Sequence, residues 1–326
     1  MATNPQLFSE TIDLLRADAP RIRAELYAGI VGALPRGASM FPAGASEVSH
    51  ELIDALVYTF TAAQRTGTLP EAAVKKLQAW ALDLRRFGFP PEAYPVFARV
   101  VREALGAGIA ARLVLDEAAE EMARAAAAAD ISGVPPAAAA RVVGVDKLGD
   151  ISRVRLTAGM ALSYAPGQFM PVMHTAEPGV WVNLAPALPA NPFGQLEFHL
   201  RGELRPRLGD YLTLGAARGA SPRLERGTLH VRARSTGSAA AQAIIFAALE
   251  LDAPPRTTVD LDDSPATAAI RAAAGENGWL HLGPDDGAAE VVVCGPAGEV
   301  GPHAAGDVLI CPDSPPDWSY QDFYQG

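Results

Sequence analysis

The chain has 326 residues, of which 49% are hydrophobic and 20% are charged. This apolar content is sufficient for packed cores and excludes global disorder, and the length predicts two or three domains. The formal net charge of −10 argues against a nucleic-acid partner, since such partners attract an excess of Lys and Arg. The two cysteines, Cys294 and Cys311, are too few for a disulfide framework or a thiolate metal cage.

The apolar stretches are too short or too rich in alanine to span a bilayer. The first ten residues also lack the basic and apolar regions of a signal peptide. We therefore expect a cytoplasmic protein without membrane insertion.

The first third of the chain has a helical pattern. Apolar residues recur at helical spacing over residues 9–129, for example at Ile22, Leu26 and Ile30. Gly or Pro interrupts the pattern where helices must end, near residues 34–37, 65–70, 87–91 and 106–108. We predict an all-α domain over residues 1–132.

Pro135 and Pro136 indicate a linker, after which the periodicity changes. Short β-rich runs separated by turn residues follow at 141–145, 152–156, 196–200 and 211–214. This pattern predicts a small antiparallel β-barrel or sandwich over residues 137–224.

The last third alternates between strand and helix patterns. The predicted order is strand 228–233, a turn at Gly237, helix 239–250, strand 257–261, helix 266–274 and strand 291–294. Such alternation is typical of an α/β layer with a parallel sheet, which we predict over residues 226–326.

Four short motifs occur in this order along the chain. They are Gly-Phe-Pro-Pro-Glu followed by Tyr-Pro at 88–95, Tyr-Ala-Pro-Gly-Gln at 164–168, Gly-Asp at 209–210 and Cys-Gly-Pro at 294–296. Together with the domain order, they resemble the flavohaemoglobin family, in which a globin domain precedes a ferredoxin-reductase-like module. The resemblance covers nearly the whole chain and implies a globin domain, an FAD-binding barrel and an NAD-binding domain.

The resemblance implies a haem pocket in the first domain, and the chain departs from the family there. Tyr27 and Phe41 match the distal tyrosine and the phenylalanine that packs on haem, and Tyr94 matches a tyrosine of the proximal network. Leu84 stands at the position of the proximal histidine, and leucine cannot bind iron. His50 falls near the distal side, and we interpret it as a polar residue near a helix start.

The implied FAD site also differs from the family pattern. Trp181, Asn183 and Leu184 stand where the family has the Arg, Tyr and Ser of its flavin-binding strand. The charge and the ring partner of the flavin are therefore both absent from this strand.

The implied nucleotide site keeps part of its pattern. The family has a Gly-x-Gly-x-Thr-Pro turn where this chain has Ser235-Thr236-Gly237-Ser238, so one glycine remains and the fingerprint is not met. The Cys-Gly-Pro motif is retained as Cys294, Gly295 and Pro296, and we interpret Cys294 as a buried strand end.

Other catalytic patterns are weak. The histidines show no metal-ligand spacing, so we expect no metal site. Thr257 begins a Thr-x-x-Asp sequence that resembles the phosphothreonine motif favoured by forkhead-associated domains, although a strand threonine is the favoured interpretation.

These losses favour a flavohaemoglobin-like pseudoenzyme that binds no haem, FAD or NAD(P)H and acts as a protein-interaction or regulatory scaffold. Its expected partner is another cytoplasmic protein, such as a phosphothreonine-reading or signalling protein. The alternative is an NAD(P)H oxidoreductase of oxygen or nitric oxide chemistry, with His50 or a tyrosine at the iron and Trp181 on a flavin. A third hypothesis is a sensor that holds an apolar ligand in the globin pocket.

Overall fold

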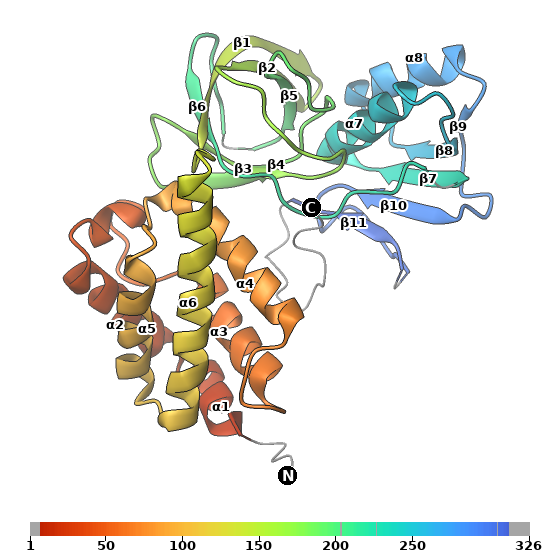
Figure 1. Ribbon diagram of the computed structural model, residues 1–326. Coiled ribbons are helices and arrows are strands. Elements are labelled where there is room, and N and C mark those ends of the chain that lie inside the picture. The colour runs from red at the N-terminus through yellow and green to blue at the C-terminus, as the bar shows by residue number, and fades with distance from the viewer. Residues whose placement is uncertain (1–6, 203, 226, 305, 313–326) are drawn as a thin grey trace. The chain divides into compact units, whose positions relative to one another are not determined.

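The computed structural model describes residues 7–202, 204–225, 227–304 and 306–312. The chain divides after Ala137 into two compact units (Figure 1). The first unit is helical, and the second contains two β-sheets. The all-α, antiparallel and parallel α/β classes predicted from the sequence are therefore confirmed.

Six α-helices and two short 3-10 helices make up the described part of the helical unit. They are α1 (Ser9–Ala17), α2 (Ala19–Ala33), η1 (Gly37–Met40), α3 (His50–Ala63), α4 (Glu71–Leu84), η2 (Arg85–Phe87), α5 (Ala93–Leu105) and α6 (Ile109–Ile131). Each predicted interruption falls between two α-helices. Gly88 and Gly106 end their helices in the left-handed conformation, which glycine adopts without steric cost.

The core of the helical unit follows the apolar periodicity. Ile22, Leu26 and Ile30 are buried along one side of α2, and α6 packs against α4 and α5. No helix in the described ranges combines the length and the apolarity needed to cross a membrane.

The antiparallel sheet of the second unit has six strands. They are β1 (Ala138–Leu148), β2 (Ile151–Ala158), β3 (Met170–His174), β4 (Trp181–Leu184), β5 (Gln195–Leu200) and β6 (Tyr211–Leu214). Their order is β4-β3-β6-β1-β2-β5, and a bridge between Pro186 and Phe198 joins the two outer strands. This closure makes the sheet a small barrel around a core that includes Val154, Leu156 and Phe198.

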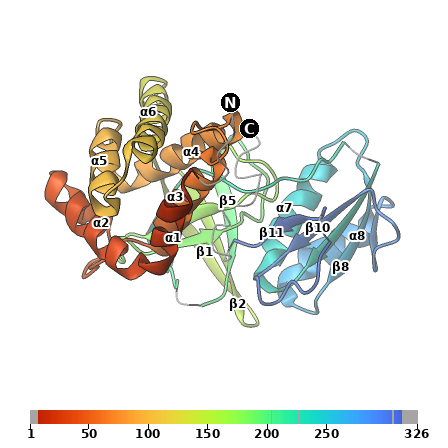
Figure 2. The ribbon, with the colours of Figure 1, turned by 90° about the horizontal axis from the view of Figure 1, so that it is seen from below.

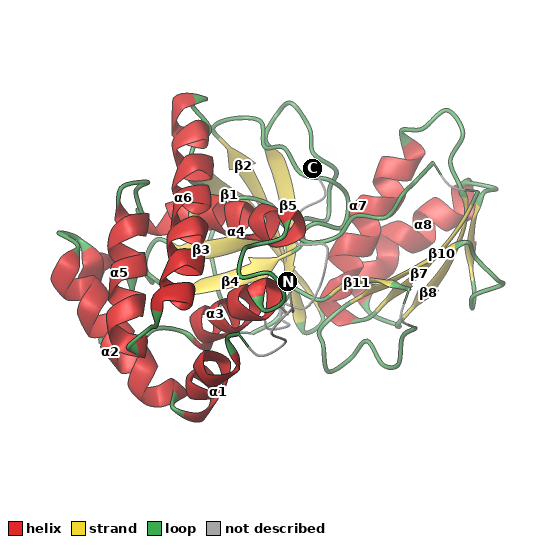
Figure 3. Cartoon of the chain, turned by 60° about the horizontal axis from the view of Figure 1, so that its bottom comes forward, coloured by secondary structure: helices red, strands yellow, loops and turns green. Residues whose placement is uncertain are grey.

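The parallel sheet alternates with helices, as the sequence predicts. Its elements are β7 (Thr228–Ala233), η3 (Ser235–Gly237), α7 (Ser238–Leu249), β8 (Arg256–Leu261), η4 (Pro265–Thr267), α8 (Ala268–Glu276), β9 (Leu280–Leu282), β10 (Glu290–Cys294) and β11 (Val308–Ile310). Strand order is β11-β10-β7-β8-β9. Figures 2 and 3 show α7 and α8 beside this sheet.

The strand order creates a switch point in the parallel sheet. The chain runs from β7 outward through β8 to β9 and then returns to β10 on the other side of β7. In open parallel sheets, ligands bind beyond the carboxyl ends of the strands at such a point. Helix α7 follows β7 and contacts β5 of the barrel as well as β7 and β10, so the barrel meets the parallel layer here.

Candidate functional site

A cavity of about 290 Å³ lies at the switch point. The barrel contributes residues 182–185 of β4 and the loop after it, together with His199 and Arg201 at the end of β5. The parallel layer contributes the turn after β7 and the loops after β10 and β11, among them Thr236, Gly237, Pro296 and Glu299. A cavity lined by two layers, apolar with a few polar groups, has the form of a small-molecule site.

The turn after β7 is shaped by two unusual residues. Ser235 has a φ of 54°, the one positive φ of a non-glycine residue in the part of the chain that the structure describes. At Gly237 a Cβ atom would lie 2.2 Å from the carbonyl oxygen of Cys294. Glycine is therefore required for the close approach of this turn to the end of β10, which the sequence motif did not reveal.

Arg201 lines the cavity and contacts residues of both the barrel and the parallel layer. Its Nη1 lies 2.7 Å from the Glu299 carboxylate, and its Nε lies 2.9 Å from that of Asp150. Nη1 also donates a hydrogen bond to the Ser235 hydroxyl at 3.1 Å. The positive charge of Arg201 is therefore already balanced by two carboxylates.

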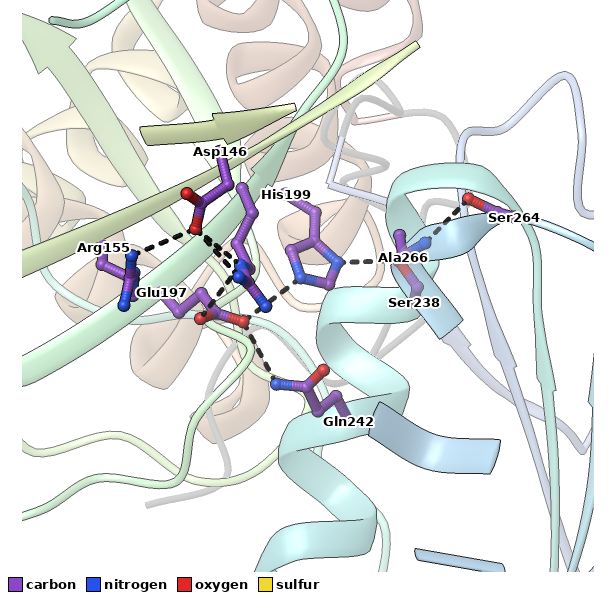
Figure 4. Close-up of polar contacts among 9 residues, drawn as sticks. Asp146, Arg155, Glu197, His199, Ser238, Gln242, Ser264 and Ala266 are labelled. Carbon is purple, nitrogen blue, oxygen red and sulfur yellow. Dashed lines mark hydrogen bonds and ion pairs between the residues drawn. The ribbon is translucent and has the colours of Figure 1, made fainter. Parts of the chain in front are cut away.

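A buried polar network links the barrel to α7 beside the cavity (Figure 4). His199 Nδ1 lies 2.7 Å from the Ser238 hydroxyl, and Nε2 lies 3.4 Å from Glu197 Oε1. Gln242 donates to the same Glu197 oxygen at 3.2 Å. All four side chains belong to residues less than 10% exposed. Each side chain has a hydrogen-bond partner on the other side of the boundary between β5 and α7, so the network holds the two layers together.

Glu197 remains charged within this network. Burial raises the pKa of its carboxyl group. Hydrogen bonds from His199 and Gln242 and the charge of Arg153 lower this pKa by more than burial raises it, so the net shift is downward. Serine, histidine and glutamate are the residue types of a hydrolytic triad. However, Ser238 is 1% exposed, so its hydroxyl is closed to a substrate, and we assign the group a structural role.

The sequence analysis did not identify Arg218, which places a positive charge beside β4. Arg218 Nη2 donates to Asn183 Oδ1 at 2.6 Å, and the guanidinium lies 5.6 Å from the centre of the Phe169 ring. The sequence signal was weak, because Arg218 lies 35 positions from its partner and outside the predicted flavin strand. Strand β4, in which the sequence analysis found no arginine, is therefore contacted by an arginine supplied from beyond β6.

The structure brings the predicted flavin and nucleotide residues around one cavity. Asn183 and Leu184 line it from the barrel, and Thr236, Gly237 and Pro296 line it from the parallel layer. Ser235, Ser238, Cys294 and Gly295 adjoin these lining residues along the chain, and Trp181 lies on β4. Their roles remain predictions. Burial raises the pKa of the Cys294 thiol, so this residue stays protonated and is not a nucleophile.

A second hollow of about 420 Å³ lies at the carboxyl ends of β8 and β9. Asp260 and Leu261 line it at the end of β8, Gly283 and Pro284 follow β9, and Arg271 contributes from α8. The carboxyl edge of the parallel sheet therefore carries two hollows, one at the switch point between β7 and β10 and one at the ends of β8 and β9.

The predicted proximal side of the haem pocket is filled by protein groups. Leu84 is the last residue of α4, and its neighbour Asp83 forms a buried ion pair with Arg86. Tyr94 is fully buried, and its hydroxyl donates to the Ala81 carbonyl at 3.1 Å. Burial raises the pKa of Tyr94, so the phenol stays neutral.

Two of the predicted distal residues lie together, and the third, His50, pairs with a different residue. The rings of Tyr27 and Phe41 contact each other, with centres 5.0 Å apart. His50 is an exposed residue at the start of α3, and its Nε2 lies 2.8 Å from Arg23 Nη1. Since residues 7–137 contain no other histidine and no cysteine, they offer iron no interior imidazole or thiolate.

Two remaining predictions concern phosphorylation and metals. Thr257 is fully buried in β8, and its hydroxyl donates to the Pro255 carbonyl at 2.9 Å, so a kinase could reach it only after β8 opens. Within the described ranges, no group of three or more His, Cys, Asp or Glu residues is arranged to hold a metal ion.

The chain is similar to solved structures with the same architecture. The flavohemoglobin from Malassezia yamatoensis with bound FAD and heme matches 96% of this chain and 99% of its own, with a TM-score of 0.68 and 15% identity. No protein-family model matches the sequence, and no curated protein matches it either. The chain therefore has a flavohaemoglobin-like fold, as its motifs predicted.

Two further structures match about half of the chain. The ferredoxin reductase in carbazole 1,9a-dioxygenase covers 54% of this chain and 69% of its own, with 20% identity and a TM-score of 0.42. The flavohem-like FAD/NAD binding domain of nitric oxide dioxygenase from Vibrio cholerae covers 53% and 78%, with 14% identity and a TM-score of 0.37. Both TM-scores are below 0.5, so the fold assignment rests on the Malassezia protein.

The expectation that the chain has no cofactor is contradicted by this comparison. The solved structure that matches nearly the whole chain holds both FAD and heme. The expectation came from comparing single motif positions, which misses groups such as Arg218 that other elements bring to the same place. A cofactor-free scaffold is therefore not retained.

Proposed function

We propose that this flavohaemoglobin-like chain is a regulatory protein whose second unit binds a pyridine dinucleotide at the switch point of its parallel sheet. The cavity lined by Asn183, Thr236 and Gly237 is the observation that carries the proposal. A ligand placed there would contact the turn after β7 and the start of α7, and the positive end of a helix dipole favours a phosphate.

The second hollow supports a ligand of dinucleotide length. It lies at the ends of β8 and β9, beyond the same edge of the sheet as the cavity at the ends of β7 and β10. A ligand with two ring systems joined by a pyrophosphate could place one ring system in each hollow. A single small ring would occupy one of them.

Binding of NADH and NADPH to the full chain tests this proposal. We expect saturable binding, measured by calorimetry and by quenching of tryptophan fluorescence. Thr236→Asp places a negative charge in the cavity wall and should weaken binding at least tenfold. Thr157→Asp, on the exposed face of β2, is the matched control and should bind as the unmodified chain does. Absence of saturable binding up to about 1 mM would exclude the proposed function.

The cavity also favours a second candidate, an NAD(P)H oxidoreductase. It is lined by β4 of the barrel and by the turn of the parallel layer, so a flavin ring held at Asn183 and Leu184 would face a nicotinamide at Thr236. A bound flavin would supply a hydride acceptor. Incubation with FAD and NADH separates the two candidates: consumption of NADH indicates the oxidoreductase, and binding without consumption indicates the regulatory protein.

A further inference from the structure

A carboxylate of the chain itself occupies a backbone donor next to the proposed site. Asp262 directly follows β8, and its Oδ2 accepts a hydrogen bond from the Ser235 N–H at 2.5 Å. Its Oδ1 accepts from the Ser264 N–H at 3.2 Å. The side chain thus joins the loop after β8 to the turn after β7.

The occupied donor belongs to the turn that lines the ligand cavity. Thr236 and Gly237, the next two residues, are lining residues, and the Ser235 hydroxyl accepts from Arg201, which also lines the cavity. A short hydrogen bond from a backbone N–H to a carboxylate oxygen is the type of contact that a phosphate oxygen would make. Two anionic oxygens cannot share one N–H at this distance.

The charged neighbours of Asp262 are engaged with other groups. Arg234 pairs with Asp260 at 2.6 Å. Arg271 donates to the Asp262 backbone carbonyl at 2.9 Å and lies 3.3 Å from the Asp263 carboxylate. The contacts that position the Asp262 carboxylate are therefore the two backbone N–H groups, which a ligand phosphate could compete for.

We propose that Asp262 is an internal stand-in for a ligand phosphate, which the dinucleotide must displace from the Ser235 N–H in order to bind. This inference rests on the proposed function and adds its regulation: phosphate binding and attachment of the loop after β8 to the turn exclude each other. The site selects ligands through the competition between their phosphate and this carboxylate.

Asp262→Asn and Asp262→Ala test the inference in the full chain. Asparagine keeps the shape and removes the charge, whereas alanine removes the competing oxygens. We expect both variants to bind NADH and inorganic pyrophosphate at least tenfold more tightly. Reduced nicotinamide riboside has no phosphate, so its affinity should not change. Asp252→Asn removes an exposed carboxylate after α7, outside the lining of both hollows, and is the control, with unchanged affinities.

The outcomes separate this inference from the proposed function. If the unmodified chain binds NADH and both Asp262 variants bind it equally well, only the stand-in role is refuted. An equal gain for the riboside would also refute it, because opening of the cavity rather than phosphate competition would then be the cause. If neither the unmodified chain nor any variant binds NADH, both the proposed function and the role of Asp262 are refuted. Circular dichroism of each variant establishes that it is folded.

Discussion

Gly237→Ala should destabilise the second unit at the switch point. The added Cβ would lie 2.2 Å from the Cys294 carbonyl oxygen, 2.3 Å from its carbon and 2.5 Å from the Gly295 nitrogen. All three are backbone atoms, so they cannot rotate aside as a flexible side chain could. The turn and the end of β10 must separate by about 1 Å to restore ordinary contact distances.

The size of the effect follows from this overlap. Overpacking in a rigid interior costs about 1–3 kcal/mol, and backbone neighbours place this site in the upper part of that range. Gly237 has a φ of −61°, so alanine adds no backbone strain of its own. We expect a loss of about 2 kcal/mol.

Gly275→Ala provides the matched control in the same layer. Gly275 lies within α8, and a Cβ there meets no atom within 4 Å. Alanine is the better helix former, so this substitution should stabilise α8 by up to about 1 kcal/mol. Substitution by alanine is therefore expected to lower stability at Gly237 and to raise it at Gly275.

Hydrogen exchange of the full chain measures both effects locally. Amides of β7 and β10 should exchange faster in Gly237→Ala and no faster in Gly275→Ala, with helical-unit amides as the internal reference. Unchanged protection of β7 and β10 in Gly237→Ala would refute the close-approach argument, as would equal losses in both variants.

Two further predictions concern buried polar groups. Tyr94→Phe keeps the ring but leaves the Ala81 carbonyl without its hydroxyl donor, so urea unfolding of the helical unit should show a loss of about 1 kcal/mol, and an unchanged midpoint would contradict this. Burial lowers the pKa of His230, so the unfolded chain takes up a proton first as the pH falls below about 6.5. The stability of the second unit should therefore decrease from about pH 6.5 downward, and His230→Asn should reduce that slope; an identical slope in the variant would argue against His230 as its source.

The order of elements could be read from local patterns. The breaks near residues 34–37 and 106–108 fall between helices because Gly and Pro act on the backbone where they stand. The alternation of strand and helix after Thr228 likewise predicted the parallel sheet. Such signals involve only neighbouring residues, so they survive in a chain with 15% identity to its structural relative.

The content of the site could not be read in this way. The motif comparison found one glycine and no arginine at the expected positions, and the expectation of no cofactor was wrong. It could not show that Arg218 reaches Asn183, or that Asp262 reaches Ser235 across 27 positions. A binding site is a surface assembled from several elements, and a motif describes only one of them.

The sequence by itself determined the fold class, the three successive patterns and the place of the turn after β7, because periodicity and turn chemistry are properties of short segments. Only the tertiary structure decided that β4 and the turn after β7 line one cavity, that Gly237 must be a glycine, and that Asp262 holds the Ser235 N–H. These depend on distances between segments far apart in the chain, which are set when the barrel and the parallel layer pack together.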